Sequence, residues 1–284
     1  MKTNKFVLLA FLVLQTITGM AETYTYEVGQ FQKLKINANI NVIYKNLPDS
    51  IGTARYEAPS GNDNLFLLTT KNNGTLRIQL TQTQWQNSEK LPVLYVYSDF
   101  LSSVESSSDL TVYIENPAPC SSFSVNEIGN GTINIENVKA TNVSAAITTG
   151  NGTISISGKC ENASFRMVGA GMIQADRLVA ENVKCSILGT GSIGCWAVDN
   201  LNVKGIGSTK IYYKGHPNIK KTGGGKLFEL PGNDAISSSK QGSEVKSFDA
   251  PLVKEETENN IEDNEDEYEI PDDEEYETIV TDDD

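Results

Sequence analysis

Histidine is almost missing from this chain, which has His216 as its single example among 284 residues. A Ser-His-Asp or Cys-His catalytic site needs a histidine base, and a zinc site needs several His or Cys ligands that can meet. His216 stands before Pro217 in an expected loop, with no nucleophile or orienting acid beside it. We therefore expect no catalytic residue, no cofactor and no metal site.

Long apolar runs are also scarce. The one exception is Phe6–Leu14, which follows Lys2 and Lys5 and precedes the small residues of Gly19–Ala21. This run is shorter than the ~20 residues that a membrane-spanning helix needs. The pattern predicts a secretory signal over residues 1–21, cleaved near Glu22, and no transmembrane segment after its removal.

Basic residues are absent from the C-terminal end of the sequence. Of the 37 acids, 17 lie in residues 255–284, so the remaining 20 are balanced by all 23 bases and the rest of the chain is near neutral. A near-neutral body has no basic footprint for nucleic acid. We predict a linker over residues 231–254 and a disordered acidic tail over 255–284. Weak calcium capture or docking on a basic partner are alternative roles for the tail, although it lacks the spacing of an EF-hand loop.

A short glycine phrase recurs five times in the middle of the chain. It has the form Gly-x-Gly, except that the last copy ends in Thr, and the copies begin at Gly129, Gly150, Gly169, Gly189 and Gly207. The spacings of 21, 19, 20 and 18 residues indicate a repeat fold in which each unit stacks on the next. Each phrase should form a sharp corner, because glycine adopts positive φ without strain.

Apolar and polar residues alternate after each glycine phrase, as in strands with one buried face. The expected inward pairs are Leu110/Val112, Ile133/Ile135, Ile154/Ile156, Ile173/Ala175, Ile193/Cys195 and Ile211/Tyr213. Two or three strands in ~20 residues close one coil, and stacked coils place equivalent residues ~4.8 Å apart, in columns. The sequence thus predicts an all-β fold, a parallel β-solenoid over residues 22–230. Ile154 should be buried between Ile133 and Ile173, with Ser155 facing outward.

The N-terminal half repeats this chemistry less regularly. Its short alternating runs contain Leu34, Ile36, Ile40, Val42, Leu65, Leu67, Leu76, Ile78, Leu94 and Val96. Asn73-Gly74 is a hairpin signal. We expect these runs to be strands that continue the same core.

An asparagine column precedes the glycine phrases, at Asn142, Asn162, Asn182 and Asn200, and should form hydrogen bonds along the stack. Immediately before it stand Glu161, Glu181 and Asp199, which stacking would align ~5 Å apart on one edge. Parallel β-helix polysaccharide lyases and hydrolases build their sites from acids on adjacent coils. A solvated turn, or a contact with a cation or a glycan, are the alternatives.

Four cysteines occupy expected core columns. Cys120 and Cys160 share a column with Ala140, Ala180 and Val198, two coils apart, which exceeds the reach of a disulfide. Cys185 and Cys195 lie in two other columns. We expect four buried thiols that act as small hydrophobes, with a Cys185–Cys195 disulfide as the alternative.

Two aromatic side chains, Trp196 and Tyr212, alternate with core positions and should face outward. Exposed aromatics on a flat face suit contact with a glycan or a protein, and burial under the N-terminal half is the alternative.

The chain resembles the secreted head GIN domain proteins, putative autotransporter adhesins of Gram-negative envelopes, over residues 24–230. The resemblance rests on the signal, on the serial glycine phrases and on three further motifs, Phe31–Ile36, Asn73–Ile78 and Tyr213–Pro217 with Gly223–Gly225. It implies a β-solenoid exported across the inner membrane to the periplasm or the cell surface, without catalytic residues.

Three functional hypotheses follow. The first is a non-enzymatic adhesin or scaffold that binds a glycan or an envelope protein, with Glu161, Glu181, Asp199, Trp196 and Tyr212 as candidate contacts. The second is a carbohydrate-active enzyme that uses the stacked acids. The third is an envelope-assembly or stress factor that docks through its acidic tail. The oligomeric state stays open.

Overall fold

The computed structural model describes residues 21–81 and 91–231. These residues form seventeen strands and one short 3-10 helix, η1 (Pro48–Ser50). The strands of the N-terminal part are β1 (Ala21–Glu27), β2 (Lys33–Ile36), β3 (Val42–Lys45), β4 (Thr53–Pro59), β5 (Phe66–Thr70), β6 (Thr75–Leu80), β7 (Leu94–Tyr97), β8 (Ser103–Ser106) and β9 (Thr111–Glu115). The strands of the repeats are β10 (Cys120–Ile128), β11 (Thr132–Thr149), β12 (Thr153–Gly169), β13 (Met172–Gly189), β14 (Ser192–Ile206), β15 (Lys210–Lys214), β16 (Asn218–Gly223) and β17 (Lys226–Glu229). The predicted all-β class is confirmed.

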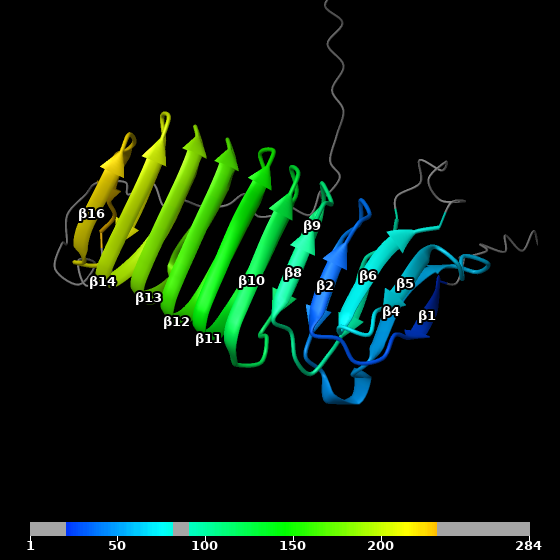
Figure 1. The fold of residues 1–284 in the computed structure, drawn as a ribbon. Helices are drawn as coiled ribbons and strands as arrows, with labels where there is room; N and C mark the ends of the chain where they lie inside the picture. Colours follow the sequence, from blue (N-terminus) through cyan, green and yellow to red (C-terminus); the bar gives the residue numbers. More distant parts are fainter. Residues whose placement is uncertain (1–20, 82–90, 232–284) are drawn as a thin grey trace, which may run out of the picture. The chain divides into compact units, whose positions relative to one another are not determined.

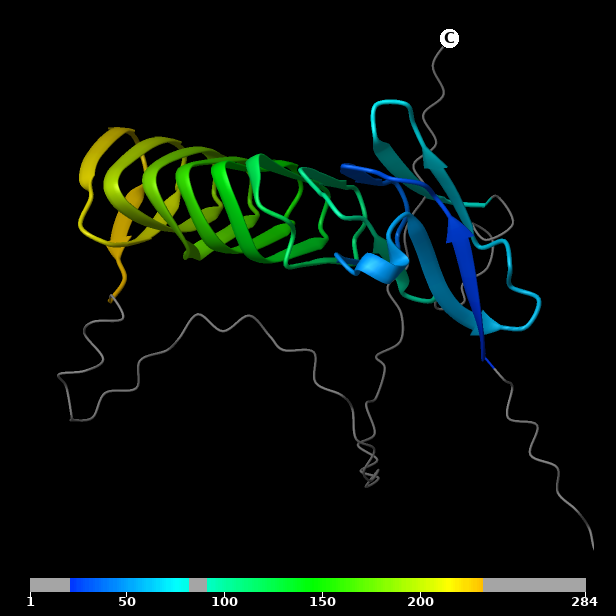
Figure 2. The ribbon, with the colours of Figure 1, turned by 90° about the horizontal axis from the view of Figure 1, so that it is seen from below.

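The strands of the repeats stack as a parallel β-solenoid, as the glycine spacing predicts. Strands β10 to β14 pair in parallel in sequence order, β15 and β16 pair with β14, and β17 pairs with β15 (Figure 1). Each long strand winds through one coil (Figure 2). The glycine phrase forms one corner of each coil, and register shifts mark two more, after residues such as Ile135 and Ala180. A coil therefore has three segments, which we call first, second and third from the glycine phrase onward.

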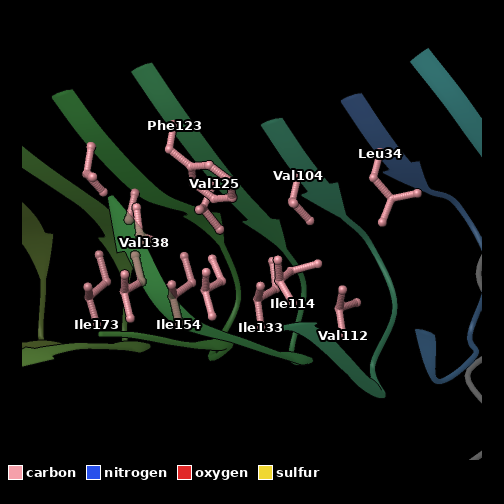
Figure 3. Packing of buried hydrophobic residues seen from close by; sticks show 14 of the residues in the cluster. Leu34, Val104, Val112, Ile114, Phe123, Val125, Ile133, Val138, Ile154 and Ile173 are labelled. Atoms are coloured by element: carbon pink, nitrogen blue, oxygen red, sulfur yellow. The ribbon is translucent and has the colours of Figure 1, made fainter. Parts of the chain in front are cut away.

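The interior is filled by columns of apolar side chains. Ile154 is fully buried and pairs with Ile133 on one side and Ile173 on the other, which confirms the predicted register (Figure 3). In the preceding coil the inward pair is Val112 and Ile114, which align with Ile133 and Ile135. The expected pair Leu110/Val112 is therefore wrong by two residues, and Leu110 is exposed. The reason is that Ser108–Leu110 forms the corner equivalent to Gly129–Gly131, so that Val112 follows Ser108 by four residues as Ile133 follows Gly129.

Ser155 differs in part from its expected exposure. Its backbone position is outward, between Asn134 and Gln174 of the neighbouring coils, yet its side chain is only 7% exposed. Arg177 covers it, and a guanidinium nitrogen of Arg177 lies 3.4 Å from the hydroxyl oxygen. An outward position in this solenoid can thus be buried by a long side chain from the next coil.

The N-terminal strands join the same stack in an order that differs from the sequence. Strand β2 lies between β6 and β8 (Figure 1). Strand β3 lies between β7 and β9, and all of these pairings are parallel. The apolar residues expected in these runs are buried, except Leu67, which is exposed. Leu67 faces away from the core because it lies on β5, an antiparallel strand of the hairpin that turns at Asn73-Gly74.

Antiparallel strands cover this end of the stack. Strand β4 pairs with β7, β1 pairs with β4, and β5 pairs with β6. They bring together a cluster of aromatic rings, in which Tyr56 stacks on Tyr24 and Tyr26 and meets Phe66 edge to face. These strands close the open edge that a parallel stack would otherwise present.

All four cysteines are free thiols. Cys185 and Cys195 are buried and in contact, and the hydrogen bond between them, with burial, raises the pKa of Cys185 well above its usual value. Cys120 and Cys160 align through Ala140, two coils apart as predicted, but both are half-buried rather than buried. Their column continues to Ala197, not to Val198 as expected, because β14 carries one extra residue at the corner and Val198 points outward.

Three predictions lie outside the described residues: the signal, the linker beyond residue 231 and the acidic tail. No helix in the described part of the chain has the length and apolar character needed to span a bilayer.

Candidate functional site

The three candidate acids stand together at the corner between the second and third segments. Glu161 and Glu181 are side by side, since the residues that flank them, Cys160/Ala180 and Asn162/Asn182, are paired. Asp199 precedes Asn200 as Glu181 precedes Asn182, with the extra residue Val198 before it. All three side chains are exposed. They form an outward column of carboxylates at this corner.

The asparagine column holds this corner in place. The amide nitrogen of Asn162 donates to the side-chain oxygen of Asn142 at 3.2 Å, that of Asn182 to Asn162 at 3.3 Å, and that of Asn200 to Asn182 at 2.8 Å. This ladder ties four successive coils together beside the acids, so the spacing of the carboxylates is fixed by the backbone stack.

Trp196 lies on the second segment, in an outward column with Val179 and Lys214. The ammonium group of Lys214 is 5.7 Å from the centre of the Trp196 ring and forms an ion pair of 3.0 Å with Asp176. The ring is half-buried as a result. The Trp196 ring therefore lies near the acid column, three residues before Asp199 along the chain.

Tyr212 lies on another side of the coil. It belongs to the first segment, on β15, and its ring stacks on Phe228 of β17 with centroids 5.1 Å apart. The five candidate residues therefore form two groups, the acid column with Trp196 and the ring pair of Tyr212 with Phe228. Phe228 was not among the expected contacts, although it stands three residues after Gly225 as Tyr212 stands three residues after Thr209.

His216 is a loop residue, as predicted. It follows β15, its side chain is exposed, and its nearest acid is Glu229 at 3.8 Å. Among the residues that the structure describes, no three His, Cys, Asp or Glu side chains lie close enough together to hold a metal ion.

The core contains one ionisable residue that the sequence patterns did not indicate, Glu127. Glu127 is completely buried, in a column with Ser106 before it and Ile147 after it. Its carboxylate oxygens make no regular hydrogen bond. Burial raises its pKa to about 7, the charge of Asp109 adds to the rise, and the nearby Gly131 N–H and Ser106 hydroxyl oppose it. The sequence holds a signal for it, because the next three coils carry the apolar residues Ile147, Met167 and Ile187 in this column.

Comparison with solved structures supports the fold. A putative adhesin from Bacteroides fragilis NCTC 9343 is 24% identical with a TM-score of 0.66, and the match covers 74% of this chain and 97% of that one. A putative adhesin from Parabacteroides distasonis ATCC 8503 is 19% identical with a TM-score of 0.56, over 75% of this chain and 98% of that one. A putative lipid binding protein from the same species is 19% identical with a TM-score of 0.53, over the same shares of the two chains. At these identities the likeness concerns the fold alone.

No curated protein matches the chain. A family description does match: "Putative auto-transporter adhesin, head GIN domain" covers residues 30–217, which include every coil from β2 to β15. With the glycine corners, the stacked columns and this match together, the chain belongs to the head GIN domain family of putative auto-transporter adhesins.

Proposed function

We propose that this protein is a non-enzymatic binding module of the adhesin type that works at the Gram-negative cell envelope. The observation that carries the proposal is the repetition of outward side chains along the stack. The asparagine ladder and the acid column beside it present like groups on successive coils. Such a surface, with one group about every 4.8 Å, suits an extended ligand that also repeats, such as a glycan chain.

The comparisons support a non-catalytic, adhesin-like module. The family is described as one of putative auto-transporter adhesins, and two of the similar structures are named putative adhesins. Export across the inner membrane, to the periplasm or the cell surface, is part of the proposal and rests on the N-terminal signal pattern. Protease treatment of intact cells would separate the two locations, since only a surface protein is cleaved.

Glycan binding is the first test. The mature chain, residues 22–284, is applied to a glycan array and incubated with the same glycans to follow their degradation. We expect binding without turnover, weakened by Trp196→Ala or Tyr212→Ala according to which of the two groups makes the contact. Absence of binding to any glycan or envelope protein would contradict the proposal.

The runner-up is a carbohydrate-active enzyme that uses Glu161, Glu181 and Asp199. Turnover of any polysaccharide that is lost in Glu181→Gln would establish it and overturn the binding module. Glu136→Gln is the matched control, because Glu136 is also an exposed acid but lies at a different corner. Docking through the acidic tail remains a third hypothesis and concerns residues outside the described part. A chain ended at Gly242 would lose its partner if that hypothesis holds.

A further inference from the structure

The third segments of the last coils carry four cations on their outward side. Arg166 of β12 and Lys204 of β14 share a column with Ser186 of β13 between them. Lys184 of β13 and Lys220 of β16 share the neighbouring column, with Asn202 between them. We call these four residues the basic strip. One cation comes from each of four successive strands, and the two columns alternate.

The basic strip has no neutralising partners. All four side chains are exposed, and within residues 21–81 and 91–231 none of them forms an ion pair. The strip lines a hollow of about 520 Å³ whose other lining residues include no Asp or Glu. The third segments of the late coils thus carry four cations around a hollow that no acid lines.

The centre of the hollow has the groups that hold an oxyanion. Arg166 and Lys204 stand on either side of Ser186, about two strand spacings or ~10 Å apart at the backbone. Lys184 lies two residues before Ser186 on the same strand, so its side chain points to the same side of the sheet. The hydroxyl groups of Ser164 and Thr222 also line the hollow. A phosphate over Ser186 would be reached by three cations and a hydroxyl, which is the chemistry of charge-assisted hydrogen bonding.

An apolar row runs beside these cations, toward the glycine corner. Val168, Leu188 and Ile206 pair in register on β12, β13 and β14. Leu188 is 51% exposed and Ile206 is 69% exposed. A second hollow, of about 410 Å³, is lined by this apolar row and shares Arg166, Ser186 and Lys204 with the first. Large apolar side chains left in water next to a row of cations mark a surface that is covered in use.

We propose that this surface binds a phosphate-bearing membrane lipid. The phosphate lies over Ser186, between Arg166 and Lys204, and the first part of an acyl chain lies along Val168, Leu188 and Ile206. A soluble polyanion would use the cations and leave the apolar row in water, so the two features together favour an anionic amphiphile. This inference rests on the proposed function as a binding module and names a ligand class for it.

The test is co-sedimentation of the mature full-length protein with vesicles. We expect binding to vesicles that contain phosphatidylglycerol and none to vesicles of phosphatidylcholine alone. Arg166→Gln with Lys204→Gln should weaken binding by about 30-fold, since each cation near an anionic surface contributes about a factor of five. Ile206→Ser should weaken it by roughly fivefold, because less apolar area is buried.

Matched controls make the assignment specific. Lys210→Gln with Lys226→Gln removes the same charge from an exposed pair of the first segment, and Leu67→Ser removes a comparably exposed leucine of β5. Both should bind as the unchanged protein does, and circular dichroism should show every variant folded.

Three results would overturn the lipid assignment. The first is equal loss in the Lys210/Lys226 control, which would show adherence by net charge alone. The second is equal binding to phosphatidylcholine. The third is tight binding of a soluble polyuronate that Ile206→Ser leaves unchanged, which would assign the surface to an anionic glycan. Glycan-array binding by a protein that does not sediment with phosphatidylglycerol vesicles would keep the proposed function while removing this inference.

Discussion

Ile154 is enclosed by isoleucines of the coils on both sides, Ile133 and Ile173 (Figure 3). A cavity made there cannot collapse easily, because the neighbouring backbones are tied by parallel hydrogen bonds. Ile154→Ala should therefore lower the free energy of unfolding by about 2–5 kcal/mol, measured by urea denaturation. Ile154→Asp should prevent folding, since the buried charge would have no partner.

The control for this register is a change at an outward position. Ser144 is exposed and lies between Ser124 and Ser164, so Ser144→Lys should be nearly silent. Ser155→Lys should cost stability although its position is also outward, because the new side chain must displace Arg177. A folded Ile154→Asp variant, or a destabilised Ser144→Lys variant, would show that the inward and outward assignments are exchanged.

Glu127 makes stability depend on pH. Its pKa is about 7 in the folded protein against 4.5 as the usual value, so between these values the unfolded chain loses the proton while the folded chain keeps it. The free energy of unfolding therefore falls by roughly 3 kcal/mol in all as the pH rises from about 4.5 to 7. Above pH 7 this contribution no longer changes. Below pH 4.5 Glu127 is protonated in both the folded and the unfolded state, so no charge is buried on folding.

Glu127→Gln isolates this contribution, because every other titrating group is common to the two proteins. We expect the stability gained by Glu127→Gln, from urea denaturation at a series of pH values, to grow between about pH 4.5 and 7. A difference that stays constant over this range would mean that the folded carboxyl group titrates as it does in the unfolded chain.

At the scale of elements, the glycine corners hold successive coils at close approach. Gly150 has φ +88°, and a Cβ atom there would lie 2.2 Å from the carbonyl oxygen of Gly129 in the preceding coil. Gly61 has nearly the same φ, +87°, but a Cβ atom there would meet nothing within 4 Å. The two positions share the backbone strain and differ in the steric clash.

Alanine at these two glycines should therefore separate strain from clash. Gly61→Ala should cost roughly 1–2 kcal/mol for the left-handed conformation, and Gly150→Ala should cost clearly more because the coils must move apart. Gly150→Val should be more severe still. Equal losses in the two alanine variants, measured by thermal or urea unfolding, would show that the corner needs only positive φ.

Strand positions in the repeats were predictable from local pattern, whereas the stacking order was not. The alternation around Ile133, Ile154 and Ile173 specifies which side chains point inward. The position of β2 between β6 and β8 rests on pairings between segments far apart in the sequence, and strands with the same alternation give no local signal of which of them become neighbours.

The candidate sites follow the same division. The acid column could be predicted because Glu161 and Glu181 stand before asparagines at one repeat interval. The basic strip could not, because its cations alternate between two columns in which neutral residues such as Ser186 and Asn202 stand between them. The burial of Glu127 could not be predicted from the column alone. The column holds apolar residues from Ile147 onward, and Glu127 is an isolated acid at its start.

At the scale of the described molecule, stability is spread over neighbouring coils, because each coil contacts only the next. The ends matter most in such a stack. At one end β1, β4 and β5 cover the first coils. At the other, β16 and β17 cover β14 and β15, and Leu227 packs over Ile211. Loss of either cover would expose apolar columns and a free strand edge.

Two truncations test where the folded body ends. A chain ended at Gly242 should melt at the temperature of the mature protein, because it lacks only residues with 17 acids among the last 30, too polar to join a core. A chain ended at Gly215 also lacks β16 and β17, so Ile211 loses the cover of Leu227 and β14 loses a paired strand. Its melting temperature should fall by several degrees. If the first truncation melts many degrees lower, the acidic segment contributes to the folded structure, and the boundary near residue 230 is wrong.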